Sequence, residues 1–302
     1  MEINSTTNEA YARIVGDLMS ADQCGTRGGE TREIMSVTVR SDDPRQRLFI
    51  RDGYNLAFQL QEAIAYWTGQ NPGHVHRYNT NMERFMTDGK LEGSAYGRYL
   101  RHIPHDQIDR VINQLRENPE TRQAIINFHQ SGVERYDGPD VACTVYMQFL
   151  IRNNELHVIT SMRSQDMLWG YPYDVHNFQW IQEVVAGILD VDLGTYTHRM
   201  NSCHYYTEFE KKIIDSRKHY KMYTMPDIRL DEKSLGMVMF YLKEGLKWAR
   251  RDTIPTGEIY MIQQHSDFYA DWLRFMTVYE QRRFHDNEEF SMDISFDVFS
   301  NN

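Results

Sequence analysis

The side chains best suited to chemistry lie between residues 140 and 206 of this 302-residue chain. Cys143 opens an apolar segment, and a cysteine becomes a nucleophile once its thiol is deprotonated. Arg163 and Ser164 end the next apolar segment and are residue types that bind phosphate. His204 and Tyr206 are two residues apart on a predicted strand, so they point to the same face. A lone cysteine is more often a small buried hydrophobe, so Cys143 gains meaning only from these neighbours.

The elements that position these residues follow from local pattern. Asn153 and Asn154 separate two apolar segments, which predicts a β-hairpin between Cys143 and Arg163. Asp174 follows Gly170-Tyr171-Pro172-Tyr173 and is predicted to be the N-cap of a helix over residues 175–189. The strand with His204 and Tyr206 comes next.

This order of parts resembles the thymidylate synthase superfamily. The motifs that carry the resemblance are Cys143 before a strand ending in Gln148-Phe149, Arg163-Ser164-x-Asp166, Gly170-x-Pro172 and His204-x-Tyr206. Synthases that act on uracil carry Asn where this chain has Asp174, whereas the cytidylate hydroxymethylase branch carries Asp. The pair Cys143-Thr144 and the run Met162-Arg163-Ser164 are also similar to that branch. The resemblance covers about residues 7–206 and is expected to fade beyond them.

The resemblance implies an α/β (α+β) fold in which a mixed β-sheet at a dimer interface is flanked by helices. We expect one catalytic domain over residues 1–302, with a divergent helical part at residues 207–302. It also implies a homodimer whose active sites are shared. The substrate would be a nucleoside monophosphate, and the one-carbon donor would be 5,10-methylenetetrahydrofolate.

The resemblance assigns a role to each candidate residue. Cys143 would attack C6 of the pyrimidine, with Arg163 lowering the pKa of its thiol. Glu62 and Tyr96 would handle protons, and Asp174 would recognise the base. The nucleotide would be bound by Arg27, Arg163, Ser164, His204, Tyr206 and, from the second subunit, Arg122. Asp166 and Gly170 would face the folate donor.

Two of these residues have plainer readings when the resemblance is set aside. Arg27 lies in a Gly-rich stretch that on its own favours a surface loop over a phosphate site. Glu62 lies on a predicted helix, where an acidic residue is usually just solvated.

Arg122 is followed by Gln123, whereas the family has an Arg-Arg pair at this place. The predicted phosphate site has therefore lost one charge or replaced it.

Asp174 decides the predicted base, because an ionised carboxylate only accepts hydrogen bonds. It suits the amino group of cytosine and a protonated N3. Met82 and Phe85 stand where synthases usually have tryptophans, and Thr144 stands where they have histidine. These changes favour water over hydride as the group that completes the reaction, which gives a hydroxymethyl product. The alternatives are a cytidylate C5-methyltransferase, a divergent thymidylate synthase, and a nucleotide-binding regulatory relic without turnover.

Composition limits the classes of protein to which the chain can belong. The chain is 41% hydrophobic and 25% charged, as in ordinary globular proteins. Its net charge of −10 argues against nucleic acid as a partner. The polar N-terminus and the lack of a long apolar run predict no membrane span. Three cysteines form no zinc or disulfide pattern. We expect a cytoplasmic protein without a bound metal, in the host cytoplasm if a phage encodes it.

The remaining elements are predicted from apolar spacing. Helices are expected over residues 7–20, 54–68, 106–116, 235–249 and 258–281, and a strand over 34–39. Residues 78–93 read as a loop. The acidic stretch 286–289 and the tail to residue 302 match no closing segment of the family.

Overall fold

The computed structural model describes residues 1–49, 53–69, 77–88, 91, 93–102, 104–129, 140–218 and 223–285. One mixed sheet has the strand order β1-β3-β8-β6-β5-β4, with β2 paired to β3 and β7 to β8. The strands are β1 (Glu2–Asn4), β2 (Gln23–Thr26), β3 (Gly29–Ser41), β4 (Ile125–Asn127), β5 (Thr144–Arg152), β6 (Glu155–Met162), β7 (Gln165–Asp166) and β8 (Asp192–Tyr206). β6 and β8 run parallel, while β3 and β8 run antiparallel. The mixed α/β class expected from the sequence is therefore confirmed.

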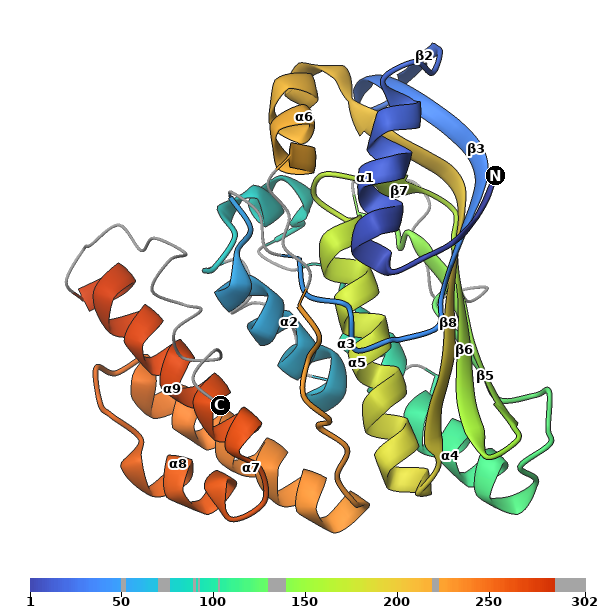
Figure 1. Ribbon diagram of the computed structural model, residues 1–302. Helices are drawn as coiled ribbons and strands as arrows, with labels where there is room; N and C mark the ends of the chain where they lie inside the picture. Colours follow the sequence, from blue (N-terminus) through green and yellow to red (C-terminus); the bar gives the residue numbers. More distant parts are fainter. Residues whose placement is uncertain are drawn as a thin grey trace.

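Helices pack against one face of this sheet. The α-helices are α1 (Thr7–Leu18), α2 (Leu56–Thr68), α3 (Tyr96–Arg101), α4 (Gln107–Glu117), α5 (Tyr171–Leu189), α6 (Glu210–Lys218), α7 (Glu232–Ala249), α8 (Thr256–Gln263) and α9 (Asp267–Glu280). Short 3-10 turns form η2 (Thr80–Phe85) and η3 (Thr207–Phe209), and η4 (Gln281–His285) is a π-helical turn. Figure 1 shows α1 and α5 beside the sheet, with α2 between α5 and the group α7–α9.

The predicted hairpin is confirmed as β5 and β6. Asn153 and Asn154 form its turn with φ values of 52° and 63°, a left-handed conformation that Asn tolerates better than most residues. Apolar side chains alternate along both strands, and the inward ones, such as Phe149 and Val158, are fully buried. The hairpin thereby sets Cys143 directly before β5 and Arg163 directly after β6.

The start of α5 differs from the prediction. The helix begins at Tyr171 with Gly170 as its N-cap and Pro172 in its first turn, so Asp174 is not the N-cap. Proline suits the first turn, where its missing N–H has no partner to lose. Asp174 therefore lies inside the first turn, and its carboxyl group is available for another role.

The C-terminal region also differs from the prediction. The helix expected over residues 258–281 is two helices, because Ser266 caps α9 by accepting a hydrogen bond from the N–H of Tyr269. The loop expected over 78–93 contains η2. The acidic stretch 286–289 and the tail to residue 302 lie outside the described residues. No helix in the described ranges is long and apolar enough to cross a membrane.

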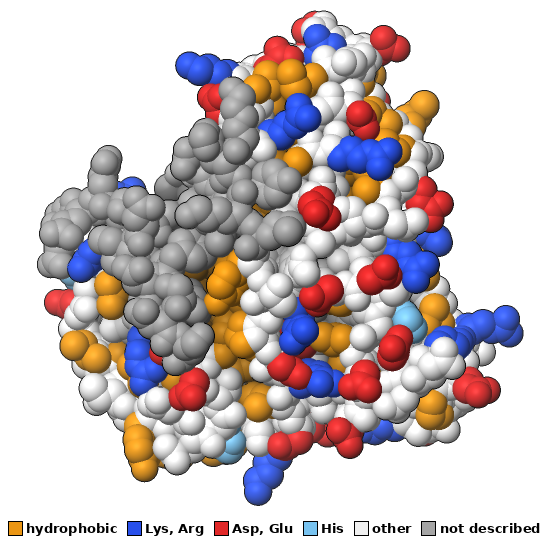
Figure 2. Space-filling model, viewed as in Figure 1, with side chains coloured by type: hydrophobic (Ala, Val, Ile, Leu, Met, Phe, Trp, Pro, Cys, Tyr) orange, Lys and Arg blue, Asp and Glu red, His pale blue; other side chains and the backbone are white. Residues whose placement is uncertain are grey.

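The Gly-rich stretch forms the turn of a hairpin that ends in strand β3. β2 and β3 are a hairpin whose turn is Arg27 and Gly28, and β3 is longer than the predicted strand. Positive and negative side chains are mixed over the face of the molecule seen in Figure 2, with no continuous basic area.

Candidate active site

Cys143 is held by contacts to its backbone from two sides. The hydroxyl oxygen of Tyr96 accepts hydrogen bonds from the N–H groups of Cys143 and Thr144, at 3.2 and 3.1 Å. The N–H of Arg163 donates to the carbonyl of Cys143 at 2.8 Å. Tyr96 is the first residue of α3 and is only 5% exposed. The structure thus brings three of the predicted catalytic and binding residues together.

The guanidinium group of Arg163 anchors the segment that leads to Cys143. Its Nε donates to the carbonyl of Ala142 and its Nη2 to that of Val141, both at 2.9 Å. Ser164 follows at the end of β6 and is half-buried. Arg163 therefore lies beside the cysteine, as predicted.

Burial outweighs the predicted effect of Arg163 on the thiol. Arg163 does lower the pKa of Cys143, but burial raises it more, and Asp174, Asp140 and Asp166 raise it further, to about 11. At neutral pH the free protein therefore holds Cys143 as a thiol.

Asp174 and Glu62 are two carboxyl groups whose pKa values are raised into the neutral range. Burial raises the pKa of Asp174 to about 7, although the Nε2 of Gln165 donates to its Oδ2 at 2.8 Å and opposes the shift. Burial and the nearby charge of Asp174 raise the pKa of Glu62 to about 8. Strongly raised carboxyl pKa values are typical of residues that transfer protons. With a pKa of about 7, Asp174 can act as an ionised acceptor, as expected, and its neutral form can also donate.

Hydrogen-bonded neighbours fix the position of Glu62. The Nδ2 of Asn177 donates to Glu62 Oε2 at 2.7 Å, and Gln59 Nε2 donates to Asn177 Oδ1 at 2.5 Å. Tyr66, one turn after Glu62 on α2, also hydrogen-bonds to it. Glu62 is therefore not the solvated surface residue that its helix position alone suggests.

The residues predicted to hold the sugar lie at the same end of the sheet, because β7 pairs with β8 and places Asp166 opposite His204. His204 and Tyr206 are two residues apart on β8, so their side chains lie on the same face, with ring centroids 5.4 Å apart. The Nδ1 of His204 is buried and has no protein partner among the described residues. A Cβ at Gly28 would lie 2.6 Å from the hydroxyl of Tyr206, so the turn that carries Arg27 presses on this ring. Such a buried, unpartnered nitrogen is suited to a ligand hydroxyl.

Asp166 and Gly170, expected to face the donor, lie in the turn between β7 and α5. Asp166 Oδ1 accepts from the N–H groups of Leu168 and Trp169, at 2.7 and 2.8 Å, which fixes the orientation of the carboxylate. Trp169 is half-buried and packs edge-on against Phe209. An oriented carboxylate next to an accessible aromatic ring fits a flat heterocycle with donor groups on its edge.

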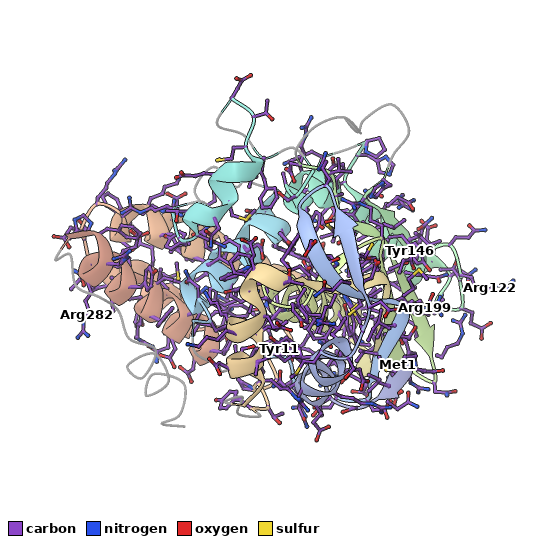
Figure 3. All side chains as sticks on the ribbon, turned by 90° about the horizontal axis from the view of Figure 1, so that it is seen from above. Met1, Tyr11, Arg122, Tyr146, Arg199 and Arg282 are labelled. Atoms are coloured by element: carbon purple, nitrogen blue, oxygen red, sulfur yellow. The ribbon has the colours of Figure 1, made fainter. Side chains whose placement is uncertain are left out.

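Arg122 does not lie with the other predicted phosphate-binding residues of the same chain. It precedes β4, and its carbonyl accepts from Gln148 Nε2 at 2.9 Å. Figure 3 shows its side chain projecting outward at the edge of the molecule, on the side where Tyr146 and Arg199 lie and away from Tyr11 of α1. That side is the face of the sheet opposite α1 and α5.

Three site residues escaped the sequence prediction. Asn177 lies three residues after Asp174 on one face of α5, and Tyr66 lies four residues after Glu62 on one face of α2. Helical spacing from a predicted site residue was the available signal for both. Gln165 lies between two motif residues, and only the fold shows that it contacts Asp174.

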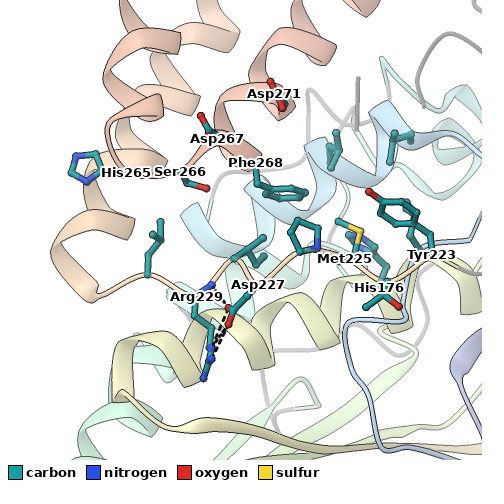
Figure 4. A pocket seen from close by; sticks show the side chains of 17 residues that line it. His176, Tyr223, Met225, Asp227, Arg229, His265, Ser266, Asp267, Phe268 and Asp271 are labelled. Carbon is teal, nitrogen blue, oxygen red and sulfur yellow. Dashed lines mark hydrogen bonds and ion pairs between the residues drawn. The ribbon is translucent and has the colours of Figure 1, made fainter. Parts of the chain in front are cut away.

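A cavity of about 490 Å³ lies elsewhere, between residues 223–230, α2 and the start of α9. Its lining includes His176, Met225 and Phe268, seen in Figure 4, but none of the residues predicted to act in catalysis. His176 precedes Asn177 on α5, so this cavity lies behind the site.

Comparison with known proteins supplies the family context. A family model described as thymidylate synthase matches residues 46–244. Two relatives named deoxyuridylate hydroxymethyltransferase, from Bacillus phage SP01 and Pseudomonas phage M6, are each 28% identical, over 222 and 164 residues. These alignments cover 68% and 53% of this chain and 58% and 47% of the relatives, so the chain spans about half the length of these relatives. Thymidylate synthase 1 of Bacillus spizizenii is 30% identical over 188 residues, which are 59% of this chain and 67% of the relative.

The matched range corrects one expectation. The resemblance was expected to fade after Tyr206, but the family match continues to residue 244, within α7.

Proposed function

The chain belongs to the thymidylate synthase family, and from that premise we propose that it transfers a one-carbon unit to C5 of a cytidine monophosphate and leaves a hydroxymethyl group. Modification of a pyrimidine at C5 is the activity that the family shares. The cytidine base and the hydroxymethyl product are the finer steps of the proposal, and each rests on its own residues.

The nucleophile of the proposed reaction is Cys143. C5 of a pyrimidine is a poor nucleophile until a thiolate adds to C6, which turns C5 into an enamine-like carbon. Tyr96 and Arg163 fix the backbone on both sides of Cys143, which supports a defined approach of the sulfur to the base. Glu62 interacts electrostatically with Asp174, and the buried Tyr96 with Cys143 and Asp174, so these groups are suited to handle the protons of the reaction.

The one-carbon donor of the family is 5,10-methylenetetrahydrofolate, and we propose the same co-substrate here. It supplies an electrophilic carbon for C5. Asp166, with its carboxylate oriented by two N–H groups, and the turn at Gly170 would hold it.

Asp174 is the observation that carries the choice of base. When sulfur adds to C6 of cytosine, negative charge develops on N3, which has no hydrogen of its own. A carboxyl group with a pKa of about 7 can donate a proton there and accept from the amino group with its other oxygen. Asp174 is not used as a helix cap, which supports this role.

The fate of the transferred carbon is inferred from the donor side. Met82 and Phe85 lie in η2, both half-buried, where synthases usually have tryptophans. Thr144 replaces the usual histidine, and its hydroxyl contacts Met162 Sδ at 3.3 Å. Smaller, non-indole side chains favour entry of water over a shielded hydride transfer.

A second candidate is hydroxymethylation of deoxyuridylate. The printed names of the phage relatives favour it. A neutral Asp174 can also pair with uracil, by donating to O4 and accepting from N3–H. The two candidates share Cys143 chemistry and differ only in which oxygen of Asp174 carries the proton.

We also propose that the enzyme is a homodimer formed through the open face of the sheet. Thr38, Arg199, Ser161 and Tyr146 are aligned across four strands by their pairing. Arg122 projects on the same side, as an arginine lent to a partner's phosphate site would.

The test is incubation of CMP, dCMP, UMP and dUMP with 5,10-methylenetetrahydrofolate. We expect hydroxymethylated cytidylate by mass and one tetrahydrofolate for each product. Oxygen from labelled water should appear in the product. Dihydrofolate formed in step with product would contradict the hydroxymethyl proposal, and a preference for either uridylate would contradict the cytidine proposal. Reactions without the donor are the control.

A further inference from the structure

Three buried side chains form a chain of hydrogen bonds that ends on Asp174. Tyr196 and His198 lie on the same face of β8, and the hydroxyl of Tyr196 is 2.8 Å from His198 Nδ1. His198 Nε2 is 2.8 Å from Gln165 Oε1, and Gln165 Nε2 donates to Asp174 Oδ2 at 2.8 Å. Tyr196 and His198 are fully buried and Gln165 is 1% exposed. Water therefore does not compete with the contacts among these three residues.

The hydrogen bonds of this chain have one favoured direction of donation, from Tyr196 towards Asp174. Burial lowers the pKa of His198 to about 3, so the ring is neutral and carries one N–H. With the proton on Nε2, Tyr196 donates to Nδ1, the ring donates to Gln165 Oε1, and the amide donates to Asp174. The opposite direction would set Gln165 Oε1 against Asp174 Oδ2, two acceptors that repel each other whenever Asp174 is ionised.

Gly170 makes room for the last contact. A Cβ at this position would lie 2.6 Å from Gln165 Nε2 and 3.4 Å from Asp174 Oδ2. The glycine of the Gly-x-Pro motif is thus the point over which the amide and the carboxyl group meet. Any side chain there would push the amide away from Asp174.

A neutral carboxyl group alone does not choose between the two bases. Cytosine presents a donor at position 4 and an acceptor at N3, and uracil presents the reverse. A carboxylic acid matches either one, depending on which of its oxygens carries the proton. Something in the protein must therefore hold the proton on one oxygen.

We propose that Tyr196, His198 and Gln165 form a relay that keeps Asp174 Oδ2 as the acceptor, holds the proton on Oδ1, and so selects the base. This rests on the proposed function for the identity of the reaction. Oδ2 would accept from the amino group of cytosine, and Oδ1 would donate to N3. The three relay residues are positioning residues, because they act through Asp174.

The other ionisable groups around Asp174 leave this role to the relay. In the part of the chain that the structure describes, the groups that interact with it electrostatically are Glu62 and Tyr66 of α2, Tyr96 of α3, Cys143 before β5, Asp166 of β7 and Tyr196 of β8. All are acids, so none donates a positive charge that would fix the proton on one oxygen. Gln165 provides the side-chain hydrogen bond that lowers the pKa of Asp174.

The first test is a measurement on the unaltered protein. Nitrogen NMR of His198 should show the Nε2–H tautomer, unprotonated at Nδ1, across the neutral range of pH. The Nδ1–H tautomer would reverse the chain and overturn the proposal.

The second test is Gln165→Met, which keeps the size of the side chain and removes its amide. We expect the preference of wild type between cytidylate and uridylate, measured as a ratio of kcat/KM, to fall about tenfold, the value of one hydrogen bond of about 1.4 kcal/mol. The carboxyl pKa of Asp174, followed by carbon NMR, should rise because its donor is gone. Gly170→Ala should act in the same direction by displacing the amide.

The matched control is Gln179→Met. Gln179 is equally buried on α5, but its Nε2 donates to the carbonyl of Val175 and not to Asp174. It should change neither the ratio nor the pKa. If Gln165→Met also leaves both unchanged, the relay is refuted. If wild type prefers uridylate, the cytidine proposal fails, yet a fall of that preference in Gln165→Met still supports the relay.

Discussion

Asp174→Asn should change how the stability of the protein depends on pH. The pKa of Asp174 is about 7 in the folded protein, against an ordinary value of 3.8. A carboxyl group with a raised pKa in the folded state contributes its full stability below the unfolded pKa and loses it as pH rises through the folded pKa. Asparagine is neutral throughout and can still accept from Gln165. The variant should therefore lack this loss.

The size of the effect follows from the shift. Each unit of pKa difference corresponds to about 1.4 kcal/mol, so a shift of about three units makes ionisation cost the fold about 4 kcal/mol at most. Part of this cost is already present at pH 5, above the ordinary pKa. Between about pH 5 and pH 8 the free energy of unfolding should fall by about 2 kcal/mol more in wild type than in Asp174→Asn.

Urea unfolding at several pH values between these limits measures the difference. Glu62 also titrates, with a pKa of about 8 in wild type, and its pKa should be lower in Asp174→Asn because the charge of Asp174 is one of the causes of the shift. Asp42→Asn is the control, since that carboxylate is 79% exposed and its removal should leave the pH dependence as in wild type. Parallel curves for wild type and Asp174→Asn would refute the conclusion that Asp174 is protonated near neutral pH.

Two further predictions concern catalysis and assembly. Cys143→Ser should bind nucleotide by calorimetry but lose turnover, because a serine alkoxide is far less available than a thiolate, and retention of most activity would exclude the covalent route. A mixture of Arg122→Ala and Cys143→Ser chains should regain part of the activity after subunit exchange, since one site of each hybrid has an intact cysteine and an intact lent arginine. No recovery from mixing, with dimers present, would exclude a shared site.

The elements that the sequence predicted well are those whose signals are local. The β5–β6 hairpin needed only alternation and two asparagines that accept a left-handed turn. α4 needed only apolar spacing after Asp106, which caps it by accepting from the N–H of Asp109. Cys143 and Arg163 fell at the ends of one hairpin, so their meeting followed from the same signals.

The features that the prediction from sequence missed depend on contacts between segments that are distant along the chain. The pKa of Cys143 sums burial with Asp140, Asp166 and Asp174, which come from three different parts of the chain. The motif suggested only Arg163 as the charge that acts on the thiol, although Asp140 lies three residues before the cysteine. The start of α5 was misplaced because Asp is a good N-cap by type, whereas Pro172 fixes the helix one turn earlier.

A thiol pKa of about 11 is compatible with catalysis when the protons of the whole reaction are counted. In the proposed reaction, addition of Cys143 to cytosine would remove one proton from sulfur and add one to N3, so the sum of the two steps would create no net charge. Asp174 can give its proton to N3, and the carboxylate it leaves can be neutralised by the proton that sulfur loses. A site that held the thiolate at rest would keep an anion beside Asp174 and Glu62, at a cost in stability that burial increases. The raised pKa values of the thiol and of the two carboxyl groups thus belong to one arrangement, which disfavours charge until a base is present to receive the proton.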